Sequence, residues 1–397
     1  MDRLRVAFDA SLVPGGSAGG VEHYVRSLIL AMSRIGEVDM TYVTSWAAPD
    51  WTDAMRSPTQ RIAVKPSPYP GAGLIPVRLR PALADLRNRR VSRRAGSLID
   101  TDVDPFFDGL GDVVHFPAHR FARTTKPSLY CVHDLLHRHW PQFLPPREVE
   151  RREANLSFAI EEATIITTHS KWAASDVVAN YEVAAQEVRP IPIGASTDNY
   201  PRVEPGRADA VIKGLGIEGE FALYPAQTWP HKNHIRLIDA MKIAIAAGSD
   251  ITLICTGAKN EHWPQIEDHI HGSGVEGRVV FTGYVKEETM VSLYSRARMV
   301  VFPSLFEGGG LPILEALRFG VPLTCSNVTS IPEYAGEAAH YFDPLSTEEI
   351  ANALIEVNDN EELRDRLSAR ASNQIGQFDW GRSARVCVDL YREVAGA

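Results

Sequence analysis

Two glutamates, Glu307 and Glu315, stand eight residues apart in the segment Glu-Gly-Gly-Gly-Leu-Pro-Ile-Leu-Glu. The glycines let the backbone approach a ligand closely, and the free N–H groups at a helix start favour an anion such as a diphosphate. A carboxylate in the first helical turn can accept hydrogen bonds from the two vicinal hydroxyls of a ribose. Either glutamate alone would be interpreted as a partner of the helix dipole or as a solvated loop residue. The complete spacing instead indicates a site for a nucleoside diphosphate.

A lysine in the second half, Lys232, could supply the positive charge that such a site needs. It lies in the segment Tyr224–Ala240, which is typical of a strand end, a loop and a helix. A lysine at a helix start can pair with a phosphate and stabilise the departure of a nucleotide diphosphate. Taken alone, Lys232 would be an ordinary surface lysine. Since no metal-binding motif is visible, we expect a site that uses no metal and no other cofactor.

Two segments of the first half are candidates for the same site. Gly19 and Gly20 belong to a glycine loop that follows the first expected strand, a geometry suited to a phosphate, although many such loops are only turns. His133 ends a buried strand, where it could bind sugar hydroxyls or the reacting phosphate, and a histidine satisfied within the core is the alternative. A metal cluster is not expected, because no acidic or cysteine residue has ligand spacing with the nearby histidines, His115, His119, His137 and His139.

Parallel sheets are expected to position these residues, because short apolar runs alternate with amphipathic stretches throughout the chain. Several runs are continuously apolar, as strands buried on both faces should be. The expected strands are Val6–Asp9, Met40–Thr44, Val113–Phe116, Leu129–His133, Ile165–Thr168, Phe221–Tyr224, Ile251–Thr256, Val279–Thr282, Met299–Phe302 and Pro322–Cys325. The predicted fold class is therefore α/β, with two doubly wound, Rossmann-like domains.

The chain has 397 residues, a length suited to two domains. The segment 189–201 is rich in proline and turn formers, so we place the hinge there. We expect an N-terminal domain over 1–198, a C-terminal domain over 199–378 and a final helix over 379–397. Two such domains would face a central cleft, since ligands bind beyond the strand ends in folds of this kind.

The segment from Glu307 to Glu315 closely resembles the E-x7-E signature of the retaining glycosyltransferases of GT-B fold, called family 4 or glycosyltransferase group 1. The resemblance implies that Glu307 lies beside the donor sugar and that Glu315 binds the ribose. It also implies that the backbone N–H groups of the loop, at Gly309, Gly310 and Leu311, meet the sugar and the phosphates. Gly309 stands where the family usually has an aromatic residue, so a wall beside the sugar is missing.

Other segments resemble the same family along nearly the full length of the chain. Lys232 matches a lysine that meets the donor diphosphate, whereas Gln227 stands where an arginine is usual, so one expected cation is absent. Val285 follows a strand end like the one that cradles the nucleobase. His133 matches a histidine near the donor sugar, and the first glycine loop matches one that faces the donor phosphate. The helix after Trp380 resembles one that crosses back onto the first domain.

The resemblance implies a retaining, metal-independent glycosyltransferase, with the donor in the second domain and the acceptor in the first. Chains with Pro-Ala-Gln and His-Lys-Asn-His at these places resemble bacterial mannosyltransferases acting on surface polysaccharide. We therefore expect GDP-mannose as donor and a saccharide or lipid-linked saccharide as acceptor. Glu307 would orient the sugar and support its positive charge or act as a covalent nucleophile, and both roles stay open.

Several alternatives remain at this point. The chain could use a UDP-sugar, isomerise a nucleotide sugar as an epimerase does, or bind the donor without turning it over. A glycogen phosphorylase would be far longer. A nicotinamide dehydrogenase would need a G-x-G-x-x-G fingerprint, which the chain lacks.

The charge balance disfavours nucleic acid as a partner. The formal net charge is −9, and residues 1–198 hold 23 basic and 23 acidic residues, so the excess acid lies in the second half. The four cysteines lack metal-ligand spacing and are expected to be buried, reduced thiols, which fits the cytoplasm. The chain opens on a strand without a signal-like region, and no stretch approaches the ~20 apolar residues of a membrane span.

A basic segment, residues 77–94, holds seven arginines, from Arg78 to Arg94, against one acidic residue, Asp85. Its apolar residues have near-helical spacing, so it has the pattern of a basic amphipathic helix. Such a helix suggests contact with anionic lipid or with a phosphate-bearing acceptor, and a solvated helix face is the alternative. We therefore expect a cytoplasmic protein with a peripheral contact at the inner face of the membrane.

Overall fold

The computed structural model describes residues 3–12, 19–57, 59–67, 80, 102–195 and 200–396. The chain divides into two compact units. The first comprises Met1–Ile193 together with Trp380–Ala397, and the second comprises Gly194–Asp379. The boundary expected at residue 198 lies outside the described residues. Each unit is a parallel α/β layer structure, which confirms the predicted fold class.

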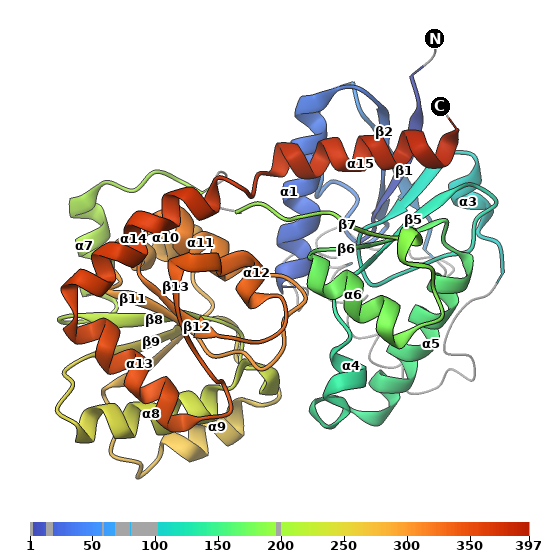
Figure 1. The fold of residues 1–397 in the computed structure, drawn as a ribbon. Coiled ribbons are helices and arrows are strands. Elements are labelled where there is room, and N and C mark those ends of the chain that lie inside the picture. Colours follow the sequence, from blue (N-terminus) through green and yellow to red (C-terminus); the bar gives the residue numbers. More distant parts are fainter. Residues whose placement is uncertain are drawn as a thin grey trace. The chain divides into compact units, whose positions relative to one another are not determined.

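The described part of the first unit contains a seven-stranded parallel sheet with the order β3-β2-β1-β4-β5-β6-β7 (Figure 1). Its strands are β1 Arg5–Ala10, β2 Asp39–Ser45, β3 Arg61–Lys65, β4 Val113–Phe116, β5 Ser128–Val132, β6 Ile165–Thr168 and β7 Val188–Pro190. Strands β4, β5 and β6 are buried along their whole length, as expected for interior strands of a sheet that is covered on both faces. The strand order reverses beside β1, which places a topological switch point between β1 and β4.

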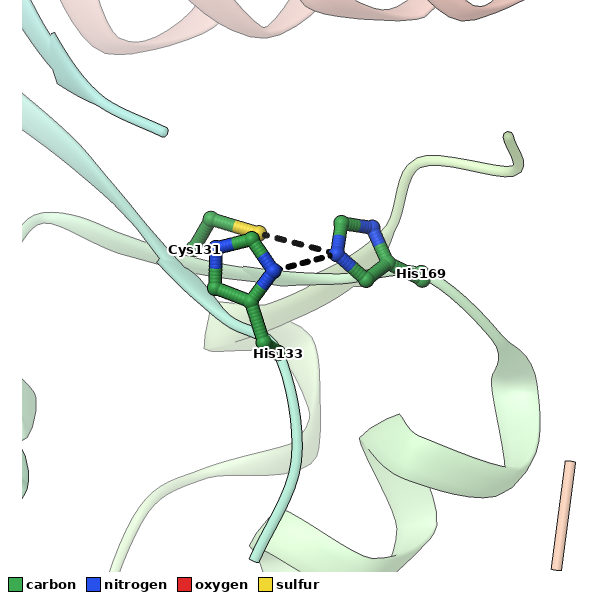
Figure 2. A group of neighbouring side chains, drawn as sticks. All are labelled: Cys131, His133 and His169. Carbon is green, nitrogen blue, oxygen red and sulfur yellow. Dashed lines mark hydrogen bonds between the residues drawn. The ribbon is translucent and has the colours of Figure 1, made fainter. Parts of the chain in front are cut away.

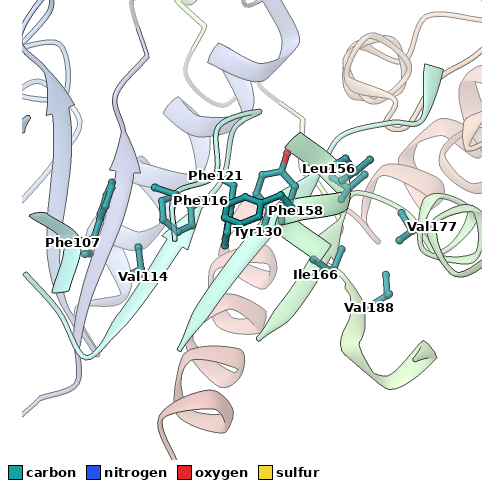
Figure 3. Close-up of a cluster of buried hydrophobic side chains, with 14 of the residues drawn as sticks. Phe107, Val114, Phe116, Phe121, Tyr130, Leu156, Phe158, Ile166, Val177 and Val188 are labelled. Atoms are coloured by element: carbon teal, nitrogen blue, oxygen red, sulfur yellow. The ribbon is translucent and has the colours of Figure 1, made fainter. Parts of the chain in front are cut away.

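Helices cover both faces of this sheet. Within the described residues they are α1 Gly19–Ile35, α3 Pro105–Asp108, α4 Leu136–His139, α5 Pro146–Glu162, α6 Lys171–Asn180 and α15 Trp380–Ala395. Phe8 packs edge-on against His115, which is hydrogen-bonded to Tyr391 of α15. The neighbouring residue Ala7 belongs instead to the buried cluster that includes Phe158 of α5 (Figure 3). Because adjacent residues of a strand point to opposite faces, α15 and α5 lie on opposite faces of the sheet.

The second unit contains a six-stranded parallel sheet within its described residues, in the order β10-β9-β8-β11-β12-β13. Its strands are β8 Phe221–Pro225, β9 Thr252–Thr256, β10 Val279–Gly283, β11 Met299–Phe302, β12 Leu323–Ser326 and β13 Ala339–Phe342. Its helices are α7 Pro205–Gly214, α8 His234–Ala246, α9 Trp263–Ile270, α10 Glu287–Arg296, α11 Leu311–Phe319, α12 Ile331–Ala335, α13 Thr347–Asp359 and α14 Glu361–Ile375. Here the order reverses between β8 and β11, so the loops after these two strands meet at one sheet edge.

Candidate functional site

The loop between β11 and α11 carries Glu307 and is fixed by side chains from a neighbouring loop. The backbone N–H of Glu307 donates to Thr329 Oγ1 at 3.2 Å, and Ser330 Oγ donates to the Glu307 carbonyl at 2.8 Å. The loop enters α11 through Gly310, where an added Cβ would lie 2.9 Å from the ring of Tyr334. Glycine is therefore required at position 310, because the Tyr334 ring leaves no room for a side chain there. Helix α11 starts at Leu311 and ends before Gly320, which adopts the left-handed conformation (φ 67°) expected of a helix C-cap.

The Glu307 side chain is paired with Lys232. Lys232 Nζ lies 2.5 Å from Glu307 Oε1, and the two side chains are 16% and 13% exposed. Lys232 ends the short 3-10 helix Pro230–Lys232 after β8, whereas Glu307 follows β11. Their meeting follows from the pairing of β8 with β11, since the carboxyl ends of adjacent parallel strands lie at one edge. An ion pair so little exposed is weakly screened by salt.

Asn233, the next residue, joins the loop after β8 to the loop after β11 through hydrogen bonds. Its backbone is left-handed (φ 62°), a conformation that asparagine tolerates better than most residues. Its buried Nδ2 donates to the carbonyls of Pro303 at 3.0 Å and Pro344 at 2.8 Å. The N–H of Leu305 also donates to the His231 carbonyl at 2.8 Å. The sequence interpretation named the lysine of the Lys-Asn pair and missed the asparagine that positions it.

We predict that Asn233→Ala lowers the melting temperature by several degrees and weakens nucleotide binding. The substitution leaves two buried carbonyls without their donor, at a cost of roughly 1–3 kcal/mol each, and it strains a left-handed backbone. Differential scanning calorimetry measures the first effect and titration calorimetry with nucleoside diphosphates measures the second. Asn233→Gly removes the strain but not the lost bonds, so it should recover only part of the stability. Full recovery with glycine would show that the side-chain bonds are unimportant.

Glu315 was expected in the first helical turn, but α11 starts at Leu311, so Glu315 lies in the second turn. It is buried, with 7% of its surface exposed. Both carboxylate oxygens accept a hydrogen bond from a tyrosine. Tyr200 donates to Oε1 at 2.9 Å, and the buried Tyr294 donates to Oε2 at 2.9 Å. Burial, with the nearby Glu315 charge, raises the pKa of both hydroxyls, so both keep their protons. The carboxylate therefore has two fixed neutral donors.

Two further residues with a predicted role at the donor lie at the same end of this sheet. Val285 is half-buried just after β10, beside Tyr284, whose side chain is 80% exposed. The charge of Tyr284 also contributes to the raised pKa of the Tyr200 hydroxyl. Gln227 follows β8, and its Oε1 accepts a hydrogen bond from Trp229 Nε1 at 2.8 Å. The amide of Gln227 is thus engaged within its own loop.

The first-half candidates belong to the first unit. Gly19 and Gly20 form the start of α1, and Gly19 has a positive φ of 45°. Residues 13–18 of the glycine loop lie outside the described residues. The two glycines therefore offer a helix N-terminus, the feature from which phosphate binding is expected. Their role at the donor stays a prediction.

His133 is held by bonds at both ring nitrogens. Its Nε2 lies 2.9 Å from the Pro117 carbonyl, to which it must donate, because a carbonyl only accepts. Its Nδ1 is then the acceptor for His169 Nε2, 2.8 Å away (Figure 2). The sequence does not indicate this pairing, because His169 is 36 residues away from His133 in the chain. The predicted contact of His133 with the donor sugar stays a prediction, and its nitrogens already have partners.

Cys131 joins this pair as a third side chain of the metal-binding type. Among the described residues, the ligand atoms of Cys131, His133 and His169 lie within 4.8 Å of one another. Two nitrogens on a tetrahedral zinc with 2.0–2.1 Å bonds would lie about 3.3 Å apart, whereas those of the two histidines are at hydrogen-bond distance. Burial raises the pKa of the Cys131 thiol to about 12, so the thiol keeps its proton. We interpret the group as a hydrogen-bonded network and assign no metal to it.

Buried histidines make the stability of the protein sensitive to mild acid. Burial lowers the pKa of His169 to about 4 and that of His115 to about 3, below the ordinary value of about 6.5. Between these values the unfolded chain binds more protons than the folded one, so stability is complete above pH 6.5 and falls as the pH decreases. Acidification from pH 6.5 to 5 should cost about 2 kcal/mol for each such histidine.

We predict that the melting temperature falls as the pH is lowered from 7 to 5, and that it falls less steeply in His115→Gln. Glutamine can still form a hydrogen bond with Tyr391 but does not bind a proton in this pH range. One of the histidines that make stability depend on pH is thus removed. His271→Gln, at an exposed position, is the control and should keep the wild-type slope. Equal slopes in all three proteins would contradict the prediction. Calorimetry at a series of pH values measures these slopes.

A comparison with known protein families matches a segment that lies within the second unit. Residues 210–374 match the family model described as Glycosyl transferases group 1. The chain is 28% identical over 282 residues to O-antigen chain mannosyltransferase B of Escherichia coli, covering 70% of this chain and 74% of that protein. It is 26% identical over 291 residues to the serotype-specific mannosyltransferase WbdA of Escherichia coli, of which it covers only 35%. The chain thus spans about a third of that second protein.

Solved structures show the same fold over nearly the full length of the chain. A crystal structure of Anabaena HepE in complex with UDP and glucose superposes with a TM-score of 0.71 at 16% identity, over 98% of this chain and 100% of that one. The fold is the GT-B fold, as the sequence predicts. None of the helices in the described part of the chain has the length and apolar character that crossing a membrane requires.

Proposed function

Residues 210–374 belong to the group 1 glycosyltransferases, and on this premise we propose that the chain transfers mannose from GDP-mannose to a saccharide or lipid-linked saccharide acceptor. The reaction retains the configuration of the anomeric carbon and uses no metal. The two relatives named above are both mannosyltransferases, which supports the choice of mannose. A role in surface polysaccharide synthesis is the corresponding proposal for the product.

The observation that carries this proposal is the Lys232–Glu307 pair, held beside the start of α11. A lysine ammonium and the free N–H groups of a helix start are the donors that a diphosphate binds. The carboxylate of Glu307 supplies a negative charge next to them, which a sugar carbon requires as it becomes positive. A cation, a helix start and a carboxylate thus meet at one sheet edge of the second unit. This combination suits the cleavage of a sugar–diphosphate bond.

In the proposed mechanism, the acceptor hydroxyl attacks the anomeric carbon on the face from which the diphosphate departs. The new C–O bond forms as the bond to the phosphate oxygen breaks, and the departing phosphate takes the acceptor proton. Lys232 and the helix start stabilise the negative charge on the departing diphosphate. Glu307 orients the sugar and supports the positive charge that develops on it. A covalent intermediate on Glu307 is the alternative mechanism.

A second candidate function, a homologue that binds the donor without turnover, is favoured by two observations. Gln227 replaces the usual arginine, and its amide is bonded to Trp229, so the second cation is missing. Gly309 provides no aromatic wall beside the sugar. Lys232 remains as the cation of the site.

The proposal is tested with the purified protein, GDP-mannose, UDP-glucose and a panel of mannose-containing oligosaccharides. Mass spectrometry detects the product, NMR determines its anomeric configuration, and release of nucleotide by water gives a readout without any acceptor. We expect transfer from GDP-mannose to give an α-mannoside, at a rate that excess EDTA leaves unchanged. Transfer from the UDP-sugar would identify a different donor, and isomerisation of the donor alone would identify an epimerase. Donor binding without any turnover would support the inactive homologue.

Peripheral membrane contact through Arg78–Arg94 stays a proposal. Nearly all of this basic segment lies outside the described residues. Arg80 is described, and its Nη1 donates to the Trp46 carbonyl at 3.2 Å. The contact would bring a lipid-linked acceptor to the protein.

A further inference from the structure

The environment of Glu315 shows how this carboxylate is held. Glu315 is 7% exposed, and a buried carboxylate is costly unless hydrogen bonds compensate for its lost hydration. Tyr200 and Tyr294 each donate one hydrogen bond to it, to different oxygens, both at 2.9 Å. An ionised carboxylate has about four acceptor positions, two on each oxygen. Each tyrosine occupies one of these positions, on a different oxygen.

This arrangement suits a ligand with two neighbouring hydroxyls. The 2′ and 3′ hydroxyls of a ribose can each donate to one carboxylate oxygen, provided that the plane of the carboxylate is fixed. A tyrosine on each oxygen fixes that plane, because rotation of the carboxylate would break both bonds. Prior orientation of a binding group increases affinity, since the ligand does not have to order it.

The two tyrosines differ in their surroundings. Tyr294 lies on α10, is fully buried, and stacks on Phe319 with a centroid distance of 5.1 Å and an interplanar angle of 5°. Tyr200 is half-buried and stands seven residues after the point where the chain leaves the first unit, at Ile193. The charges of Tyr284, just after β10, and of Glu287, the first residue of α10, also raise the pKa of its hydroxyl, and Val285, which is predicted to meet the nucleobase, lies between these two residues in the chain.

We propose that Tyr200 is a positioning residue for the ribose of the donor, acting through the orientation of the Glu315 carboxylate. Discrimination between a ribonucleotide and its 2′,3′-dideoxy analogue then depends on the Tyr200 hydroxyl. The proposal rests on the proposed function, in which Glu315 binds the ribose.

The test measures the dissociation constants of GDP and 2′,3′-dideoxy-GDP by titration calorimetry for the wild type and Tyr200→Phe, with the UDP and ADP pairs in parallel. Removal of the hydroxyl should weaken binding of the ribonucleotide about 10-fold, because the Glu315 side chain must then be ordered when the ligand binds. Binding of the dideoxynucleotide should not change, because it has no 2′ and 3′ hydroxyls that could donate hydrogen bonds to Glu315. Tyr294→Phe, which removes the donor on the other oxygen, should have the same signature.

Tyr341→Phe is the matched control. Tyr341 belongs to the same unit, and its hydroxyl donates to the Gly336 carbonyl at 2.6 Å, away from Glu315. It should leave both dissociation constants unchanged. Equal weakening of ribonucleotide and dideoxynucleotide in Tyr200→Phe would indicate a merely structural role and overturn the inference. Tighter ribonucleotide binding would also overturn it, because the hydroxyl would then compete with the ribose.

The same experiment separates the inference from its premise. If the wild type binds none of the three nucleoside diphosphates, the proposed function fails and the inference fails with it. If the wild type binds one of them and Tyr200→Phe binds it equally well, the inference alone is overturned.

Discussion

Glu307→Gln should reduce glycosyl transfer by roughly 100- to 1,000-fold, the size measured when one electrostatic group at a transition state is removed. Glutamine has the shape of glutamate but not its charge, so it cannot support a positive anomeric carbon. The amide can still accept a hydrogen bond from Lys232, which lies 2.5 Å from the carboxylate in the wild type. The donor should therefore still bind. Initial rates with labelled donor measure the first effect, and calorimetry with the nucleoside diphosphate measures the second.

Glu356→Gln is the matched control, because Glu356 is an exposed glutamate of the same unit, paired with His340 at 3.3 Å. It should retain the wild-type rate and affinity. Near-normal turnover in Glu307→Gln would refute the role of Glu307. Loss of donor binding together with activity would show that the residue serves binding rather than the chemical step.

Lys232→Met should weaken nucleoside diphosphate binding by about 10- to 100-fold, because a charge-assisted hydrogen bond to phosphate contributes about 1.5–3 kcal/mol. Turnover should fall as well, since the charge of the departing diphosphate loses its cation. Methionine keeps an unbranched apolar stem near Phe302, over whose ring the Lys232 ammonium lies at 5.6 Å. The substitution thus tests the charge more than the packing. Calorimetry in EDTA gives the affinity, and saturating donor gives the turnover number.

Lys242→Met is the control for this lysine. Lys242 lies on α8 of the same unit and pairs with Asp239 at 2.8 Å, with a side chain that is 34% exposed. It should bind nucleotide like the wild type. Unchanged affinity in Lys232→Met would mean that the helix start alone holds the diphosphate.

The interior strands could be predicted from the sequence because they are buried on both faces. Val113–Phe116 and Met299–Phe302 are strands with the predicted bounds, and every residue in them is buried. Three strands were not predicted, namely β3, β7 and β13, and each is the last strand at an edge of its sheet. An edge strand is partly exposed and therefore lacks a continuous apolar run. Strand β7 in addition ends in Pro190, which usually indicates a turn.

The candidate site was predictable where one short segment carries the chemistry. Glu307, Glu315 and Lys232 belong to motifs with characteristic spacing, and the structure brings Lys232 and Glu307 into contact. Their partners could not be predicted, because they come from distant positions. Tyr200 is 115 residues from Glu315, and a single tyrosine in a sequence gives no sign of its partner.

His133 shows the same difficulty in the first unit. Its place at the end of a buried strand suggested a side chain directed at a ligand. The structure gives its two nitrogens partners 16 and 36 residues away, at Pro117 and His169. Such bonds depend on which strands are neighbours and on their register, and neither can be derived from a local motif. Asn233 was quoted with Lys232, yet only the structure shows that it bridges two loops.

The measurement that tests the central claim most directly is the binding of GDP, UDP and ADP, in the presence of EDTA, to the wild type and to Glu315→Ala. We predict that the wild type binds one of these nucleotides, with GDP preferred, and that Glu315→Ala loses most of that affinity while remaining folded. Binding of none of them, or equal binding by the variant, would contradict a metal-independent donor site built on Lys232, Glu307 and Glu315.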